Sequence, residues 1–207
     1  MRKNANDPHQ SVSAEEGLKR LSAGNERFLN GTTRFPVLQK DVLAALTREQ
    51  HPYATIIGCS DSRVPPELIF DANFGELFVI RVAGNVVSPE VAGSMQYAGV
   101  HLKTPLFVVL GHENCGAVNA ALDLKFRNAR EPARIEILVQ NILPSLELVD
   151  EHAEPAAQVA CAVEANVRWA MRQIAESPEG RARAAEGKYL LVGAIFEIST
   201  GRVRFLE

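Results

Sequence analysis

The chain has 207 residues, of which 46% are hydrophobic and 23% charged, as in an ordinary globular protein. A formal net charge of −3, without a long run of either sign, gives no reason to expect binding to nucleic acid or to an anionic membrane surface. No apolar run approaches the roughly 20 residues that cross a bilayer, and the first residues lack the apolar stretch of a secretory signal. We therefore expect a single cytoplasmic domain over 1–207 that acts on a small molecule.

The first part of the chain has a helical pattern. We expect a helical arm over 1–50 and an α/β core over 51–207. Apolar residues at helical spacing predict a helix over 13–30, and Ser13, followed three residues later by Glu16, is typical of a capping box. A second short helix is expected after Pro36.

The rest of the chain alternates between strand and helix patterns. Continuous apolar runs predict strands buried on both faces, and Thr200-Gly201 predicts a hairpin turn before the last one. The strands are expected at 53–59, 77–83, 106–110, 190–198 and 202–206, and the helices at 89–102, 115–126, 133–149 and 155–176. This alternation predicts an α/β fold, with a mostly parallel central β-sheet, an antiparallel edge strand and flanking helices.

Residues with metal-binding side chains follow two of these strands. In parallel sheets, ligands bind beyond the carboxyl ends of the strands. Cys59 and Asp61 are two residues apart at the end of the first strand, so in an extended backbone their side chains point to the same side. His112 ends the third strand, and Cys115 opens the next helix beside Asn114, the expected N-cap. Backbone N–H groups and the helix dipole there are expected to lower the pKa of the Cys115 thiol.

Two sulfurs and one imidazole favour Zn²⁺ over Mg²⁺ or Ca²⁺, so we expect one zinc ion per chain, held by Cys59, His112 and Cys115. Three protein ligands leave the fourth position open, as in a catalytic site, and Asp61 would fill it only in a closed state. Arg63 could be a solvated surface cation. It could instead hold Asp61 in a bidentate pair and keep the fourth position free for water.

These residues resemble the motifs of the β-class carbonic anhydrases, which are Cys-x-Asp-x-Arg, here 59–63, and His-x-x-Cys, here 112–115. The similarity extends through 64–67, 75–85 and 116–118. The resemblance implies zinc-dependent, reversible hydration of carbon dioxide to bicarbonate and a proton, by a zinc-bound hydroxide that the Asp61–Arg63 pair orients. It also implies a homodimer or a dimer of dimers, with active sites at the subunit interface.

The same resemblance assigns four residues to the substrate pocket. Gln50 is similar to the family's amide donor, Phe78 and Tyr97 to its apolar walls, with Tyr97 reaching across from the partner chain, and Gly116 to the position beside the substrate. Without the resemblance, Gln50 would be a surface loop residue, and Phe78 and Tyr97 core residues. One branch of the family, inhibited by bicarbonate, carries Trp three residues before the first cysteine. Ile56 stands there, which favours the non-allosteric type.

The third cysteine and a glycine-rich run have ordinary interpretations. Cys161 lies among alanines and valines in the helical run 158–171 and is interpreted as a core thiol. The run 111–116 spaces its glycines like a phosphate-binding loop, but Ala117 and Val118 stand where that motif requires Lys and Ser or Thr.

Two other functions stay open. One is a zinc-stabilised binding module in which Asp61 never leaves the metal. Arg63 and Gln50 argue against it, because a structural zinc site requires neither. The other is a hydrolase of carbon disulfide or carbonyl sulfide on the same scaffold.

Overall fold

The computed structural model describes residues 12–34, 43–44, 46–187 and 189–207. Five strands form one sheet in the order β2-β1-β3-β4-β5, in which β5 is antiparallel to β4 and the other neighbours are parallel. The predicted fold class is therefore confirmed. The strands are β1 (Ala54–Gly58), β2 (Leu77–Arg81), β3 (Leu106–His112), β4 (Leu190–Glu197) and β5 (Arg202–Phe205).

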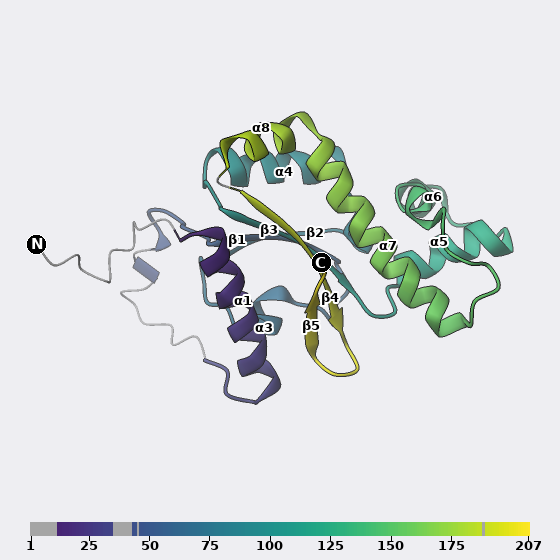
Figure 1. Ribbon diagram of the computed structural model, residues 1–207, viewed down its shortest axis with the longest axis horizontal. Helices are drawn as coiled ribbons and strands as arrows, with labels where there is room; N and C mark the ends of the chain where they lie inside the picture. Colours follow the sequence, from purple (N-terminus) through teal and green to yellow (C-terminus); the bar gives the residue numbers. More distant parts are fainter. Residues whose placement is uncertain (1–11, 35–42, 45, 188) are drawn as a thin grey trace, which may run out of the picture.

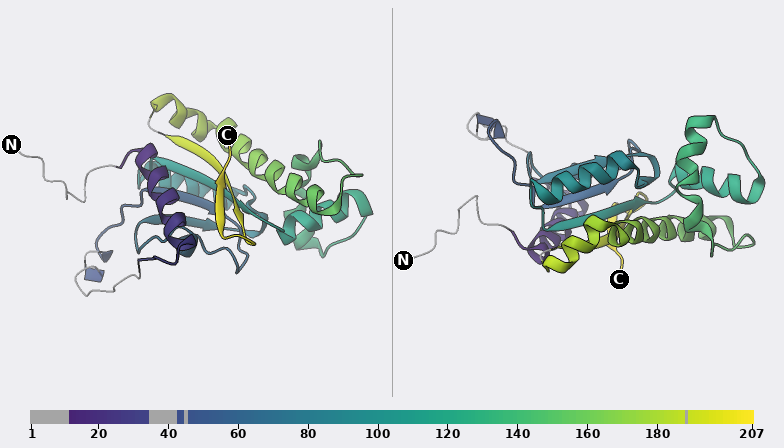
Figure 2. Two further views of the ribbon diagram at one scale, coloured as in Figure 1. Left: turned by 60° about the horizontal axis from the view of Figure 1, so that its bottom comes forward. Right: turned by 90° about the horizontal axis from the view of Figure 1, so that it is seen from above.

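Helices cover both faces of this sheet (Figures 1 and 2). One face carries α4 (Pro89–Val100), α7 (Pro155–Glu176) and α8 (Pro178–Glu186), and the other carries α1 (Ala14–Leu29) and the short α3 (Pro66–Ile69). Beyond the carboxyl end of β3 lie α5 (Gly116–Arg127) and α6 (Ala133–Gln140). Two short 3₁₀ turns complete the described elements, η1 (Ala83–Asn85) and η2 (Leu143–Leu146).

The middle of the sheet forms the core. Every residue of β1 and β3 is buried, as their unbroken apolar runs predict. The edge strand β2 is only half-buried from Leu77 to Ile80, although it is equally apolar and full burial was expected. It departs from the prediction because it has a neighbour on one side only.

Most predicted helices are found, with three differences. The predicted helix over 133–149 breaks into α6 and η2, with Pro144 inside the 3₁₀ turn, because proline has no N–H to continue a helical ladder. The sequence analysis missed α3 and α8. The short helix expected after Pro36 lies largely outside the described residues. Within the described ranges, no helix is long and apolar enough to cross a membrane.

The turn between β4 and β5 is fixed against α1. Gly201 has a φ of +77°, which glycine adopts without strain, and the turn closes as the Thr200-Gly201 pair predicts. Asn25 of α1, 4% exposed, donates to the Gly201 carbonyl at 3.0 Å and accepts from the Val203 N–H at 2.9 Å. The turn is therefore anchored to a buried side chain.

Candidate metal centre

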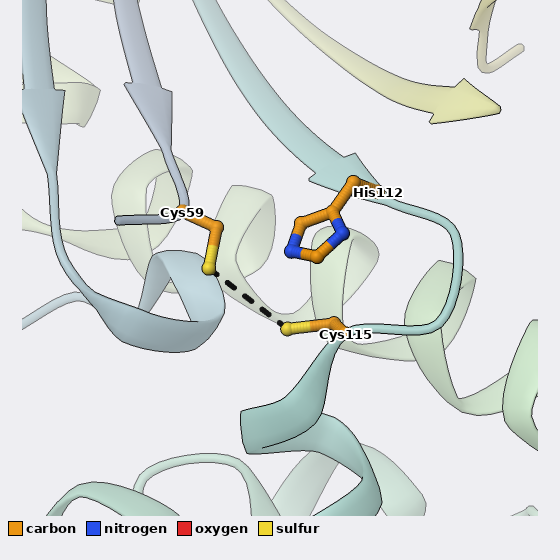
Figure 3. Close-up of side chains that lie close together, drawn as sticks. All are labelled: Cys59, His112 and Cys115. Atoms are coloured by element: carbon orange, nitrogen blue, oxygen red, sulfur yellow. Dashed lines mark hydrogen bonds between the residues drawn. The ribbon is translucent and has the colours of Figure 1, made fainter. Parts of the chain in front are cut away.

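Three side chains from separate parts of the chain meet at the carboxyl edge of the sheet (Figure 3). Cys59 follows β1, His112 ends β3, and Cys115 precedes the first residue of α5. Their ligand atoms all lie within 4.8 Å of one another, and all three residues are buried. The parallel arrangement of β1 and β3 makes this possible, because it brings their carboxyl ends side by side.

The imidazole of His112 presents one particular nitrogen to the two cysteines. Its Nδ1 lies 2.9 Å from the carbonyl oxygen of Glu113, so Nδ1 carries the proton and donates it to that acceptor. Its Nε2 is buried and has no hydrogen-bond partner within the described part of the chain. The nearest oxygen of Asp61 is 3.9 Å from Nε2, too far for a hydrogen bond. A lone pair on Nε2 therefore points into the cluster without a partner.

The two cysteine sulfurs lie within hydrogen-bonding distance of each other. Cys59 and Cys115 have their sulfurs 4.0 Å apart, and the Cys59 sulfur also accepts the N–H of Gly84 at 3.3 Å. The hydrogen bond from Cys115 lowers the pKa of Cys59 to about 4, despite its burial. The hydrogen bond to Cys59, together with burial, raises the pKa of Cys115, so the lowering expected there is wrong for the metal-free pair. Two helix N–H groups do act to lower it, but their effect is smaller.

The cluster fits a metal ion. Buried polar atoms without partners are rare, and the free Nε2 of His112 is of that kind. Two thiolates on a tetrahedral zinc, each bonded at about 2.3 Å, would lie roughly 3.8 Å apart. The observed sulfur separation of 4.0 Å is close to that spacing. A group of two sulfurs and one imidazole nitrogen could therefore hold a soft or borderline cation such as zinc.

Asp61 and Arg63 form a closed pair beside the cluster. The guanidinium of Arg63 donates from Nε to Oδ1 at 2.9 Å and from Nη2 to Oδ2 at 2.7 Å, and the backbone N–H of Arg63 donates to Oδ1 at 2.9 Å. These bonds hold the pKa of the Asp61 carboxyl well below its usual range. Arg63 is thus not simply a solvated cation, and Asp61 lies near the cluster without joining it.

Several supporting residues escaped the sequence analysis. Arg81 donates to the carbonyls of Cys59 and Asp61, at 2.8 and 2.6 Å, and so holds the loop that carries both. Gly84, with a φ of +68°, turns its N–H toward the Cys59 sulfur, and Asn166 of α7 donates to the Gly84 carbonyl at 2.9 Å. The stretch 75–85 that resembles the family contains Arg81 and Gly84, but it indicated no role for either.

The expected substrate residues do not all gather at the cluster. Gly116 is exposed beside Cys115, with open space where a Cβ would be. Phe78 of β2 and Tyr97 of α4 stack on each other with ring centroids 6.1 Å apart, and Tyr97 is 47% exposed. Gln50 is exposed ahead of β1. No described contact joins Gln50, Phe78 or Tyr97 to the metal-binding side chains.

Two further local predictions are wrong. The N-cap of α5 is Cys115, whereas Asn114 has a φ of +51° and accepts a hydrogen bond from Asn119 at 2.9 Å through its side chain. Cys161 is exposed, not a core thiol, because the buried side of α7 is formed by residues such as Ala162 and Val163. Alanine and valine around a cysteine therefore did not identify which side of the helix it occupies.

The fold and the cluster together define an α/β protein with a Cys-His-Cys group that could hold a metal ion. A sequence model of the carbonic anhydrase family matches residues 54–203. Carbonic anhydrase 2 of Mycobacterium tuberculosis is 37% identical over 192 residues, which cover 89% of this chain and 88% of that protein. The carbonic anhydrase of Mycolicibacterium smegmatis is 36% identical over 185 residues, with 89% of each chain covered.

Solved structures agree with this match. The β-carbonic anhydrase CcaA superimposes with a TM-score of 0.77 at 30% identity, covering 92% of this chain and 87% of that one. Two tetrameric β-carbonic anhydrases from Sordaria macrospora are represented by a chain with a TM-score of 0.75 at 27% identity, covering 81% of this chain and 87% of that one. The chain therefore belongs to the carbonic anhydrase family of enzymes, in its β class, as its motifs predict.

Proposed function

We propose that the chain binds one zinc ion through Cys59, His112 and Cys115 and interconverts carbon dioxide and bicarbonate. The family and the donor set support this proposal. Zinc, when bound, supplies a Lewis acid that ionises water at neutral pH. The Asp61–Arg63 pair is the observation that carries the proposal. A zinc site that only stabilises the fold closes with four protein ligands and needs no such pair.

The role proposed for Asp61 is that of a hydrogen-bond acceptor. Because Arg63 keeps its pKa low, the carboxylate stays ionised at working pH and cannot donate. Its Oδ2 is 3.9 Å from Nε2 of His112, so the carboxylate would lie next to a metal held by Cys59, His112 and Cys115. With a metal bound, Asp61 would accept a hydrogen bond from a water beside it and so orient that water toward carbon dioxide. Arg63 keeps the carboxylate in this position and away from the metal.

The substrate pocket is proposed to be completed by a second copy of the chain. Phe78 pairs with Thr55, near the amino end of β1, whereas Cys59 follows its carboxyl end. Thr55 and Cys59 are four residues apart, which in a strand corresponds to about 13 Å. Gln50 lies before the strand begins. Phe78 and Gln50 are therefore too distant from the metal centre of their own chain. In a homodimer they would line the partner's pocket, together with Tyr97.

The surface around β2 favours such a dimer. The edge strand is apolar from Leu77 to Ile80 yet half-buried, and Tyr97 stacks on Phe78 at the same place with 47% of its surface exposed. An exposed apolar edge strand is a liability unless something covers it. The Sordaria macrospora relatives are described as tetrameric, which supports a dimer of dimers as the larger assembly.

Stopped-flow measurement of carbon dioxide hydration tests the proposal directly. Protein with one zinc per chain by elemental analysis should accelerate hydration, and zinc-free protein should not. Sedimentation should show a dimer or a tetramer. Fully loaded protein that leaves the uncatalysed rate unchanged would exclude the proposed activity, whatever its assembly.

A further inference from the structure

Glu113 lies between two of the proposed metal ligands and reaches a distant turn. Its carboxylate accepts the backbone N–H of Ser199 at 2.8 Å and the Ser199 hydroxyl at 3.2 Å. Ser199 belongs to the turn between β4 and β5, 86 residues further along the chain. Both oxygens of the carboxylate are thus used, one for each donor of the same residue.

The backbone of Glu113 is fixed as well. Its N–H donates to the carbonyl of Phe196 at 2.9 Å, which extends the pairing of β3 with β4 by one residue. Its own carbonyl accepts Nδ1–H of His112 at 2.9 Å. The N–H bond fixes the peptide unit that precedes Glu113, and the bonds from Ser199 hold its side chain. The Glu113 carbonyl belongs to the next peptide unit and can then turn only by rotation about the Cα–C bond of a residue held on both sides. The sheet and the turn therefore limit the direction of this carbonyl.

The direction of this carbonyl decides which nitrogen of His112 is free. When the carbonyl accepts Nδ1–H, the proton stays on Nδ1 and the lone pair is on Nε2, facing Cys59 and Cys115. If the peptide plane turned away, the proton could move to Nε2, and the ring could rotate. Outer hydrogen bonds of this kind orient metal-binding histidines in general.

The anchor itself is rigid. The turn that carries Ser199 is held by Asn25 of α1, which bonds to Gly201 and Val203. Thr200 closes the turn from within, since its hydroxyl donates to the carboxylate of Glu197 at 2.9 Å. Glu113 therefore links the proposed metal centre to a turn that is fastened independently of it.

We propose that Glu113 is a positioning residue of the metal centre, which, anchored on Ser199, fixes its own carbonyl so that His112 presents Nε2 to the metal. The inference rests on the proposed function, since it explains how the chain orients His112 as a ligand of the proposed zinc ion. It concerns the affinity for zinc and the proton position on one ring, so neither readout requires turnover.

The test compares four variants by zinc affinity, measured in competition with a chromophoric chelator at fixed pH. Glu113→Ala loses both anchoring bonds, and its affinity should fall about 10–100-fold, as expected for loss of an outer hydrogen bond to a ligand. Ser199→Ala keeps the N–H donor and should lose less. Glu113→Gln keeps an acceptor for that N–H and should stay near the parent. Thr200→Val removes a hydroxyl from the same turn, but Asn25 still holds the turn and Glu113 keeps both bonds to Ser199, so its affinity should fall much less than that of Glu113→Ala.

A second measurement uses zinc-free protein with ¹⁵N-labelled histidine. The parent should carry the His112 proton on Nδ1, and Glu113→Ala should show a mixture of the two neutral forms. A folded Glu113→Ala protein with parental affinity and parental tautomer would overturn the inference. An equal loss in Thr200→Val would do the same, because it would attribute the effect to the turn alone. If Glu113→Ala does not fold, Ser199→Ala and Glu113→Gln decide, and equal affinities in Ser199→Ala and the parent overturn the inference.

The two proposals fail in different ways. Failure of the parent protein to bind zinc would refute the proposed function, while the ring spectra of the zinc-free protein would still test Glu113. Tight zinc binding by the parent, unchanged in Glu113→Ala, would refute only the role of Glu113.

Discussion

Arg63 occupies both carboxylate oxygens of Asp61 through a planar fork, with bonds of 2.9 and 2.7 Å, while Asp61 remains 3.9 Å from Nε2 of His112. The carboxylate is thus close to the proposed metal position but is paired with the guanidinium of Arg63. Two parallel N–H···O bonds fix its orientation more firmly than a single point charge could. In the proposed function, this pair decides whether the fourth metal position stays open.

We expect Arg63→Ala to reduce carbon dioxide hydration by about 10²–10³-fold, the usual cost of losing one preorganised polar group in an active site. Without Arg63, the metal becomes the strongest remaining partner for Asp61, so zinc should stay at about one per chain. Stopped-flow rates and elemental analysis measure the two quantities. Arg63→Lys keeps the positive charge but cannot form the two parallel hydrogen bonds. Its hydration rate should therefore lie between those of Arg63→Ala and the parent. A parental rate in fully loaded Arg63→Ala would show that the pair does not control the site.

Zinc binding should distinguish two of the cysteines. Cys115→Ser should lose most of the metal, because a hydroxyl is a much poorer zinc ligand than a thiolate. Cys161→Ala should keep both metal and activity, since Cys161 is exposed on α7. Elemental analysis of dialysed protein measures the outcome. Full occupancy in Cys115→Ser, or loss of zinc in a folded Cys161→Ala protein, would mean that the ligand set is wrong.

The sequence predicted the strands and the meeting of Cys59, His112 and Cys115 well because both depend on local patterns. Four apolar runs give the four parallel strands within about two residues at each end, and the cysteines and histidine follow from their places after those strands. By contrast, α8 has no apolar stripe in Glu-Gly-Arg-Ala-Arg-Ala-Ala-Glu, and α3 has only four residues, so neither has a periodic signal.

Contacts between distant residues were outside the reach of such patterns. The bond from Ser199 to Glu113 joins residues 86 positions apart, and Asn166 meets Gly84 across 82 positions. Glu113 is an exposed carboxylate, and nothing in its local sequence indicates the bonds to Ser199. The exposure of Cys161 likewise depends on how α7 packs, since cysteine itself fits either side of an amphipathic helix.

A buried carboxylate outside the metal centre should make stability depend on pH. Asp71, whose side chain is 4% exposed, accepts hydrogen bonds from Arg27 of α1 and from Arg34. Burial raises the pKa of Asp71, but the hydrogen bonds from the two arginines lower this pKa by a larger amount. The pKa of Asp71 therefore lies below its usual value. A folded-state pKa below the unfolded value of about 3.9 stabilises the fold above that pH, and this stabilisation is lost as the pH falls through the folded value.

Asp71→Asn should therefore destabilise the protein by about 2 kcal/mol at pH 7, within the usual range for hydrogen bonds to charged groups. It should also lose less stability than the parent between pH 5 and pH 3. Urea unfolding of zinc-free protein measures both, because acid would otherwise release the metal as well. Asp123→Asn, which removes an exposed pair with Arg127, should change little. Equal acid sensitivity in Asp71→Asn and the parent would contradict the prediction.

The proposed sharing of the substrate pocket between two subunits gives the sharpest prediction about assembly. Cys115→Ser should lack its metal. The double variant Gln50→Ala, Tyr97→Ala should keep its metal but lack the side chains that line the partner's pocket. Each homodimer should therefore be nearly inactive. In a mixed dimer, one site combines both defects. The other combines the double variant's metal centre with the intact pocket residues of the Cys115→Ser chain, and should work normally.

Co-expression of the two variants in equal amounts should therefore restore activity to about a quarter of the parental value per chain, since half of randomly paired two-fold dimers are mixed and each has one intact site. Mixing the two homodimers after purification should restore activity only as fast as subunits exchange. If Gln50 and Tyr97 served the metal centre of their own chain, mixed dimers would contain no intact site. Persistent inactivity of co-expressed protein, with mixed dimers verified by two affinity tags, would therefore place these residues in their own subunit's pocket.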